Sequence, residues 1–243
     1  MLDASLTLVG VGPGDPSLLT LAAVEAIKAA TVVSFPISRP GEQSIAAKIA
    51  ANWITEDKRQ LPLVFPMVSK VAERKEAWRK AGEQLASAVA NGEKIVFLSQ
   101  GDVSLFSTSS YVLLELQLHY PDFQLKLIPG VNSFAAAAAN AHWPLCMQQE
   151  QLLIMPTPDN PEILENVLNE ASQLGRVVVL LKVGKRWNWV RILLKKMDLL
   201  ENSLFAEKVG FTDEIVLPSN QVALTDSKYF SLLVIRQSVP NVI

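Results

Sequence analysis

The chain has few of the residues that build metal centres and cross-links. Its 243 residues contain one cysteine, Cys146, and two histidines, His119 and His142. A single cysteine allows neither an intramolecular disulfide nor a cysteine-built zinc site, and two histidines are too few for a histidine-rich metal centre. We therefore expect no metal site. Cys146 is expected to be a structural residue, because a free cysteine is usually buried and inert.

The chain also lacks a strong charge of one sign and a long apolar run. Its 22 Lys and Arg residues nearly balance 24 Asp and Glu residues, which argues against nucleic acid as a partner. The longest uncharged stretch, residues 127–149, is broken by prolines, asparagines and a histidine, so it makes a poor membrane span. Residues 1–5 lack the basic stretch of a signal peptide. We expect a cytoplasmic protein with no nucleic-acid or membrane partner.

Several catalytic signatures are missing as well. The sequence contains no GxSxG elbow, no Walker loop and no HExxH motif. What it does contain is apolar material, since 49% of its residues are hydrophobic and 19% are charged. That composition excludes a disordered chain and supplies a core for one large domain or two small ones.

The apolar pattern predicts alternating strands and helices. In the first part we expect strands at residues 6–9, 31–35, 95–99 and 123–128, and an edge strand or an irregular segment at 61–67. We expect helices at 21–30, 44–53, 70–90 and 107–119, and a helix that contains residues 135–139. This alternation is typical of a mostly parallel sheet covered by helices. In the second part we expect strands at 152–155, 177–181, 203–209 and 229–236, and helices at 161–172 and 187–197. A boundary around 140–146 would give two α/β domains, residues 1–140 and 145–243.

One turn, Gly10-Val11-Gly12-Pro13-Gly14-Asp15, separates the first strand from the first helix. Its glycines let a ligand approach the backbone closely. However, Pro13 has no N–H to offer a phosphate, and Asp15 stands where a dinucleotide fingerprint has glycine. The turn therefore disfavours a nicotinamide-binding oxidoreductase. A tight turn without any ligand stays the alternative.

Two more strands of the first part run into glycine-bearing loops, at Gly101–Asp102 and at residues 129–133. The carboxyl ends of parallel strands form the ligand crevice of an open α/β sheet, so we expect the three loops to converge. The crevice would hold the Asp102 carboxylate but no evident nucleophile. Such a site suits a reaction whose reagent brings its own electrophile.

A group of basic and aromatic residues in the second part allows two interpretations. Trp187 and Trp189 lie among Lys185, Arg186 and Arg191. They can bind an acidic ligand, or they can form a helix face with an aromatic anchor. We favour the anchor, because long basic side chains commonly pack their stems on apolar surface.

The loop sequences together resemble the tetrapyrrole (corrin and porphyrin) methyltransferases. The matching segments are residues 9–15 followed by 18–22, 101–108, 128–134, 180–185 and 231–235. They cover nearly the whole chain in the right order and spacing. Within that family, the Gly-Asp-x-Ser-x-x-Ser-Thr form with Tyr111 after it, and the Leu-Lys-Val-Gly-Lys form, look most like the enzymes that methylate C20 of precorrin-2.

The resemblance implies a fold of two α/β domains of the tetrapyrrole methyltransferase type, with S-adenosylmethionine between them, usually in a homodimer. It implies methyl transfer to C20 of precorrin-2 or its cobalt complex, in cobalamin biosynthesis. The positions that match cofactor contacts of the family are Pro13, Gly101, Asp102, Val103, Leu105, Phe106, Asn132, Ser133, Val183 and Val209. No residue is assigned as the base that removes the C20 proton. The substrate carboxylates are expected to meet basic groups at the rim of the trough that takes the tetrapyrrole, with Arg39, Lys70 and Lys185 as candidates.

Three positions depart from the family pattern. Val103 stands where many relatives have proline, Phe106 where the C20 enzymes often have tyrosine, and Asn132 where serine or threonine is usual. These departures leave other members of the fold open: methylation of uroporphyrinogen III, of another corrin position, or of ribosomal RNA. A non-catalytic ligand-binding module also stays an alternative, and methyl transfer itself would distinguish it.

Overall fold

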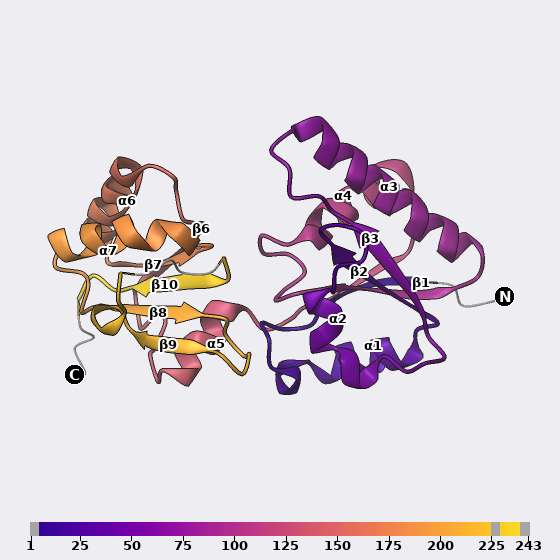
Figure 1. Cartoon of the computed structure of the whole chain (residues 1–243), viewed down its shortest axis with the longest axis horizontal. Helices are drawn as coiled ribbons and strands as arrows, with labels where there is room; N and C mark the ends of the chain where they lie inside the picture. Colours follow the sequence, from indigo (N-terminus) through magenta and orange to yellow (C-terminus); the bar gives the residue numbers. More distant parts are fainter. Residues whose placement is uncertain (1–4, 225–228, 239–243) are drawn as a thin grey trace. The chain divides into compact units, whose positions relative to one another are not determined.

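The computed structural model describes residues 5–224 and 229–238 (Figure 1). The chain forms two compact units, Met1–Asn132 and Ser133–Ile243. The sequence places the boundary around 140–146, whereas helix α5 (Ser133–Asn140) groups with the second unit because it packs against strand β10 (Ser231–Ile235). Residues 1–4, where a signal peptide pattern is missing, lie outside the described residues.

The first unit is built on a five-stranded parallel sheet, in the order β3-β2-β4-β1-β5. The strands are β1 (Ser5–Gly10), β2 (Val32–Ile37), β3 (Arg59–Val64), β4 (Lys94–Ser99) and β5 (Leu125–Ile128). The predicted parallel sheet is confirmed, and so is the edge position of β3, which tolerates Pro62 because an edge strand lacks one row of ladder hydrogen bonds. β1 lies between β4 and β5, so its end stands beside the ends of both neighbours.

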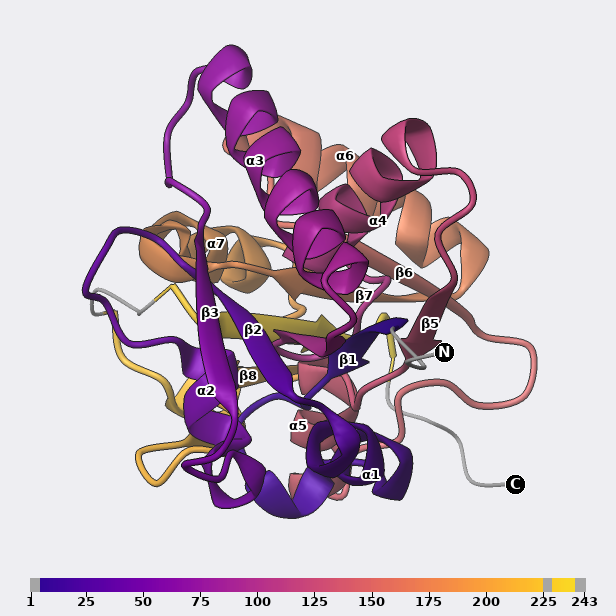
Figure 2. The ribbon, with the colours of Figure 1, turned by 90° about the vertical axis from the view of Figure 1, so that its right-hand side faces the viewer.

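Helices cover both faces of this sheet. They are α1 (Leu21–Ala29), α2 (Ile45–Ile49), α3 (Val71–Ala90) and α4 (Thr108–His119). In Figures 1 and 2, α3 and α4 lie side by side on one face, and α1 and α2 lie on the other. The hydroxyl of Thr20 caps α1 by accepting from the Ala23 N–H at 3.1 Å. Along α1, Leu21 is exposed, whereas Ala23 and Ile27 are buried.

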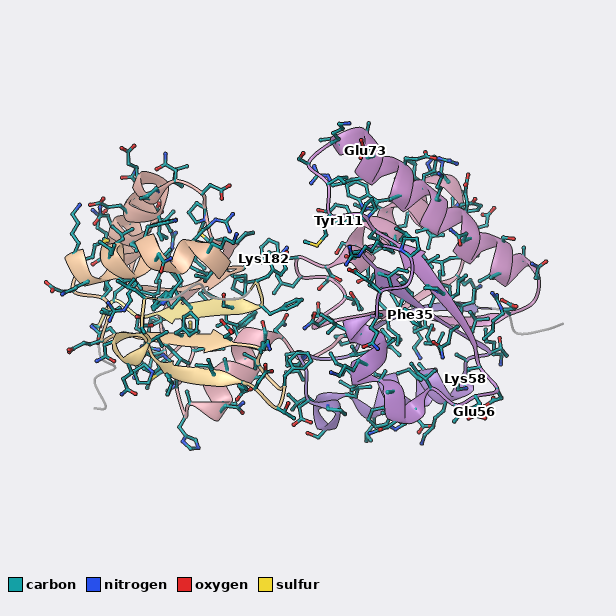
Figure 3. The ribbon with its side chains drawn as sticks, in the orientation of Figure 1. Phe35, Glu56, Lys58, Glu73, Tyr111 and Lys182 are labelled. Carbon is teal, nitrogen blue, oxygen red and sulfur yellow. The ribbon has the colours of Figure 1, made fainter. Side chains whose placement is uncertain are left out.

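A buried lysine holds the other end of α1. Lys58 is 8% exposed, and its ammonium donates to the carbonyl oxygens of Lys28 and Ala30, both at 2.8 Å. A cation is favoured there because the last carbonyls of a helix have no partner within it and carry partial negative charge. Figure 3 labels Lys58 beside α1.

The second unit has a mixed sheet, in the order β6-β7-β10-β8-β9. The strands are β6 (Gln151–Pro156), β7 (Arg176–Leu181), β8 (Ser203–Glu207), β9 (Ile215–Pro218) and β10. β6 and β7 pair in parallel, whereas β10 is antiparallel to both β7 and β8. Because β10 runs in the opposite direction, its start lies between the carboxyl ends of β7 and β8. The sequence did not predict β9.

Two helices of this unit, α6 (Pro161–Leu174) and α7 (Trp187–Lys196), cover one face of the sheet, and α5 covers the other (Figures 1 and 2). Trp187 is fully buried, and its indole N–H donates to the Ala223 carbonyl at 2.9 Å. The interpretation of Trp187 as an aromatic anchor is thus confirmed. Within the described ranges, no helix is both long enough and apolar enough to span a membrane.

Candidate active site

Three glycines bring the ends of β1, β4 and β5 into backbone contact. A Cβ atom on Gly10 would lie 2.6 Å from the Gly130 nitrogen and 2.7 Å from the Gly101 oxygen. A Cβ atom on Gly130 would lie 2.1 Å from the same oxygen. Neither position accepts a side chain unless the backbone moves. The expected convergence of the three loops is therefore confirmed, and it depends on side chains being absent.

A pair of hydrogen bonds joins the first two loops. The Gly101 N–H donates to the Gly12 oxygen at 2.7 Å, and the Gly12 N–H donates to the Gly101 oxygen at 3.2 Å. Gly101 has a φ of 71°, a left-handed conformation that disfavours other residues. A Cβ atom on Gly101 would meet no atom within 4 Å. The loop thus presents bare backbone to open space, which is the kind of surface a ligand can approach.

Asp102 fastens the second loop to the third. One carboxylate oxygen accepts from the N–H and the hydroxyl of Ser104, at 2.8 and 2.5 Å, and the other accepts from the Gly130 N–H at 3.0 Å. Burial raises the pKa of Asp102, but the hydrogen bonds from Ser104, Gly130 and Val103 outweigh it, so the pKa lies below its ordinary 3.8. The carboxylate is therefore ionised at neutral pH and holds the two loops together.

A chain of buried hydroxyls fixes the segment between β4 and α4. Ser99 and Ser107 share a hydrogen bond at 2.5 Å, and Ser107 and Ser109 share another at 2.6 Å. Ser109 then donates to the Val103 carbonyl at 2.9 Å. The sequence did not indicate a role for these serines, although Ser107 belongs to the motif that carries the family resemblance. Satisfied networks of this kind hold one loop conformation.

The other predicted cofactor positions of the first unit lie on the same three loops. Pro13 is buried, and its carbonyl accepts from the side-chain amide of Gln100 at 3.0 Å. Val103 is buried as well, whereas Leu105 and Asn132 are half-buried.

Phe106 is the unusual member of the set, because it is 46% exposed and has a φ of 50°. A bulky residue in the left-handed region costs of order 1–3 kcal/mol and is found mainly at functional sites.

The predicted positions of the second unit are Ser133, Val183 and Val209. Ser133 begins α5, while Val183 and Val209 follow β7 and β8 and are both buried. The Val183 N–H donates to the Ser231 carbonyl at 3.0 Å, and the Lys208 N–H donates to the Phe230 carbonyl at 2.8 Å. The structure therefore places Val183 and Val209 on either side of the start of β10.

Two residues have surroundings that the sequence did not indicate. Asp15 caps the short 3₁₀ helix Pro16–Leu18, because its carboxylate accepts from the Ser17 N–H at 2.8 Å. Cys146 is exposed, so the expectation that it is buried is wrong. Desolvation and the nearby charge of Glu150 raise the pKa of its thiol, which makes it a poor nucleophile at neutral pH. In the described part of the chain, no cluster of three His, Cys, Asp or Glu residues is placed to hold a metal.

Comparison with known proteins assigns the family. Residues 5–223 match the family described as Tetrapyrrole (Corrin/Porphyrin) Methylases. The chain is 30% identical over 214 residues to the cobalt-precorrin-2 C(20)-methyltransferase of Salmonella typhimurium, covering 88% of this chain and 87% of that protein. It is 24% identical to the precorrin-2 C(20)-methyltransferase of Sinorhizobium sp, covering 93% of each. The uroporphyrinogen-III C-methyltransferase of Cyanidium caldarium matches over 58% of this chain and 51% of that protein, at 30% identity.

Solved structures agree on the fold. The methyltransferase CobJ has a TM-score of 0.71 at 20% identity, covering 96% of this chain and 94% of that one. A uroporphyrin-III C-methyl transferase from Thermus thermophilus, complexed with S-adenyl homocysteine, has a TM-score of 0.62 at 20% identity, covering 96% and 97%. The family match over most of the chain, the loops that carry its motifs and the shared fold lead to one conclusion: the chain belongs to the tetrapyrrole methylase family.

Proposed function

We propose that this protein transfers a methyl group from S-adenosylmethionine to C20 of precorrin-2 or of its cobalt complex. The observation that carries the proposal is the contact of three glycine-bearing loops, at the positions where the family motifs lie. The relatives named as C20-methyltransferases match about nine-tenths of the chain, whereas the uroporphyrinogen enzyme of Cyanidium caldarium matches little more than half.

The loops of the first unit fit a ligand of this kind. Gly101 presents unobstructed backbone, and Asp102 holds that backbone in place through Ser104 and Gly130. When bound, S-adenosylmethionine supplies an electrophilic methyl group and a neutral thioether leaving group, so the protein needs no nucleophile of its own. The task of the chain is then placement and exclusion of water. The half-buried Leu105 and the exposed Phe106, on the same loop as Gly101, supply apolar surface for that purpose.

Asp102 is poorly suited to be the base that takes the C20 proton. A lowered pKa makes a carboxylate a weak base, and both of its oxygens already accept hydrogen bonds from the chain. We therefore assign Asp102 a positioning role. The cofactor contacts at Pro13, Asn132, Ser133, Val183 and Val209 are part of the proposal, and single substitutions at each test them.

The decisive experiment is incubation of the protein with S-adenosylmethionine labelled in its methyl group and with precorrin-2, followed by NMR assignment of the methylated carbon. Label at C20 is the expected result. Label at another carbon, or on uroporphyrinogen III alone, would replace this function with another branch of the family. Calorimetry with S-adenosylhomocysteine and with NAD separates methyl transfer from hydride transfer, since only the first ligand is expected to bind.

We also propose that the protein is a cytoplasmic homodimer, and α4 offers the self-complementary surface. Tyr111, Leu114 and Leu118 are 45%, 61% and 72% exposed, and they lie along one side of the helix at intervals of three and four residues. The charged residue on this side is Glu115, whose side chain is only 20% exposed and lies 3.5 Å from the imidazole of His119. A two-fold contact brings a patch against its own copy, and a mainly apolar patch limits repulsion there. Light scattering is expected to give twice the mass of the chain, and Leu118→Glu to give a monomer.

A further inference from the structure

Two lysines of the second unit have backbone conformations that lysine disfavours. Lys182 follows β7 with a φ of 57°, and Lys208 follows β8 with a φ of 52°. Glycine or asparagine takes this conformation at little cost, whereas other residues lose roughly 1 kcal/mol or more. Residues in such conformations concentrate at functional sites, so each of the two lysines is a candidate for a functional side chain.

The two lysines differ in what their side chains contact. The ammonium of Lys208 forms an ion pair with Asp213. Lys182 is exposed, and within the described ranges its side chain has neither an ion pair nor a hydrogen bond. Figure 3 labels Lys182 at the end of β7. The cost of the left-handed backbone at Lys182 is therefore not offset by any contact of its side chain within the described chain.

The backbone around Lys182 is held firmly. The Lys182 carbonyl accepts from the Arg186 guanidinium at 3.3 Å, and the next N–H, of Val183, is bonded to Ser231. The Gly184 N–H donates to the Ser231 hydroxyl at 2.9 Å. The turn thus fixes where the Lys182 side chain leaves the sheet.

A second unpaired cation lies in the same turn. Lys185 is exposed and, in the part of the chain that the structure describes, has no ion pair. Its neighbour Arg186 is paired with Asp159. The other two rim candidates are also paired: Arg39 with Glu42 and Lys70 with Glu73. Among the basic residues compared in this turn and in the list of candidates for binding the substrate carboxylates, Lys182 and Lys185 are therefore the ones available to an anionic ligand.

We propose that Lys182 positions the tetrapyrrole substrate by pairing with its side-chain carboxylates, with Lys185 as a second contact. This inference rests on the proposed function, which supplies a substrate that carries several carboxylates. Lys182 directly precedes Val183, one of the proposed cofactor contacts. A cation fixed at that point orients the macrocycle without touching the carbon that reacts, so Lys182 is a positioning residue.

The test measures binding of uroporphyrin III, a stable tetrapyrrole carboxylate, by fluorescence titration of the full chain. Lys182→Gly removes the cation and relaxes the backbone, so the protein is expected to unfold at a higher temperature but to bind the probe about threefold more weakly, the usual worth of one exposed ion pair. Lys182→Gly combined with Lys185→Ala is expected to weaken binding about tenfold. Lys182→Arg should restore most of the affinity.

The matched control is Asp198→Gly, at another exposed left-handed residue, with a φ of 56°, after α7. It also places glycine at a left-handed position, and it is expected to leave probe affinity unchanged. The affinity of the wild type should fall with added salt, and that of the double variant should respond less. Unchanged probe affinity in Lys182→Gly, or an equal loss of S-adenosylhomocysteine affinity, overturns the inference. Failure of the wild type to methylate precorrin-2 rejects the proposed function instead, because probe binding is measured separately.

Discussion

The two units of the molecule hold the loops at their strand ends in different ways. Each has loops at the carboxyl ends of neighbouring strands that must keep a fixed shape. In the first unit the loops approach through bare backbone, because Gly10, Gly101 and Gly130 carry no side chains. In the second unit the loops after β7 and β8 are fastened to the start of β10, which lies between them. The first arrangement is closer and tolerates no added atom at Gly10 or Gly130, whereas the second accepts lysines.

The largest effect is expected from Gly130→Ala. The added methyl carbon would lie 2.1 Å from the Gly101 oxygen, so the backbone must move, and we expect a loss of about 3 kcal/mol in the free energy of unfolding. Denaturant titration measures it. The control is Gly41→Ala, where a φ of 84° strains the backbone but the Cβ atom meets nothing within 4 Å. It should cost about 1 kcal/mol. Equal losses in the two variants would show that crowding is not what requires Gly130.

Asp102→Asn comes next, because it removes the charge-assisted bonds between the second and third loops. An asparagine amide would also present a donor to the Gly130 N–H or to Ser104. We expect a loss of about 2 kcal/mol at neutral pH. Urea titration across pH measures it.

The pH dependence of this loss has a definite sign. The pKa of Asp102 is lowered in the folded protein, so its contribution is fully present above the unfolded pKa, near 3.8, and is lost as the pH falls through the folded pKa. The difference between the wild type and Asp102→Asn should therefore be constant from pH 7 to about 5 and shrink below about 4. A difference that does not change with pH would mean that the charge of Asp102 has no part in joining the loops.

Gly101→Leu distinguishes a role of this position in ligand binding from a role in the packing of the loop. The left-handed backbone is expected to cost about 1.5 kcal/mol of stability, yet the fold should persist because a Cβ atom at this position meets no atom within 4 Å. The side chain would instead occupy the space in front of the loop. Calorimetry with S-adenosylhomocysteine should then show at least a tenfold loss of affinity. Normal affinity in a folded Gly101→Leu protein would remove this loop from the proposed site.

The smallest effect is expected from the second unit, with Ser231→Ala. This change removes the hydroxyl that accepts from the Gly184 N–H, but the main-chain bond from Val183 to Ser231 stays. We expect a loss of about 1 kcal/mol, measured by thermal unfolding. A loss as large as that from Gly130→Ala would mean that the two units are equally intolerant of change, which contradicts the comparison above.

The strands and the glycine loops could be predicted because their signals are local. An apolar run such as that of β4 and a glycine just after it are visible in a short stretch of sequence. β9 was not predicted, since it has only four residues and alternates between exposed and half-buried positions. The antiparallel direction of β10 was also not indicated, because an apolar run looks the same in either direction.

Within the site, the sequence indicated which loops meet but not what fastens them. Asp102 was expected to contact the cofactor, and its bond from the Gly130 N–H joins two positions separated by 28 residues. The same limit applies to α5, because its alanine-rich sequence does not indicate which of the two units it packs with. Contacts between distant segments are set by packing, which no short stretch of sequence encodes.

The buried lysine under α1 has a practical consequence. Lys58 is 8% exposed and both of its carbonyl partners belong to the end of α1, while the residue itself immediately precedes the edge strand β3. An amine-specific reagent can reach this ammonium only when the end of the helix and the edge of the sheet separate. The rate at which Lys58 is labelled, compared with exposed lysines such as Lys185, therefore reports how often that corner of the first unit opens without unfolding the rest.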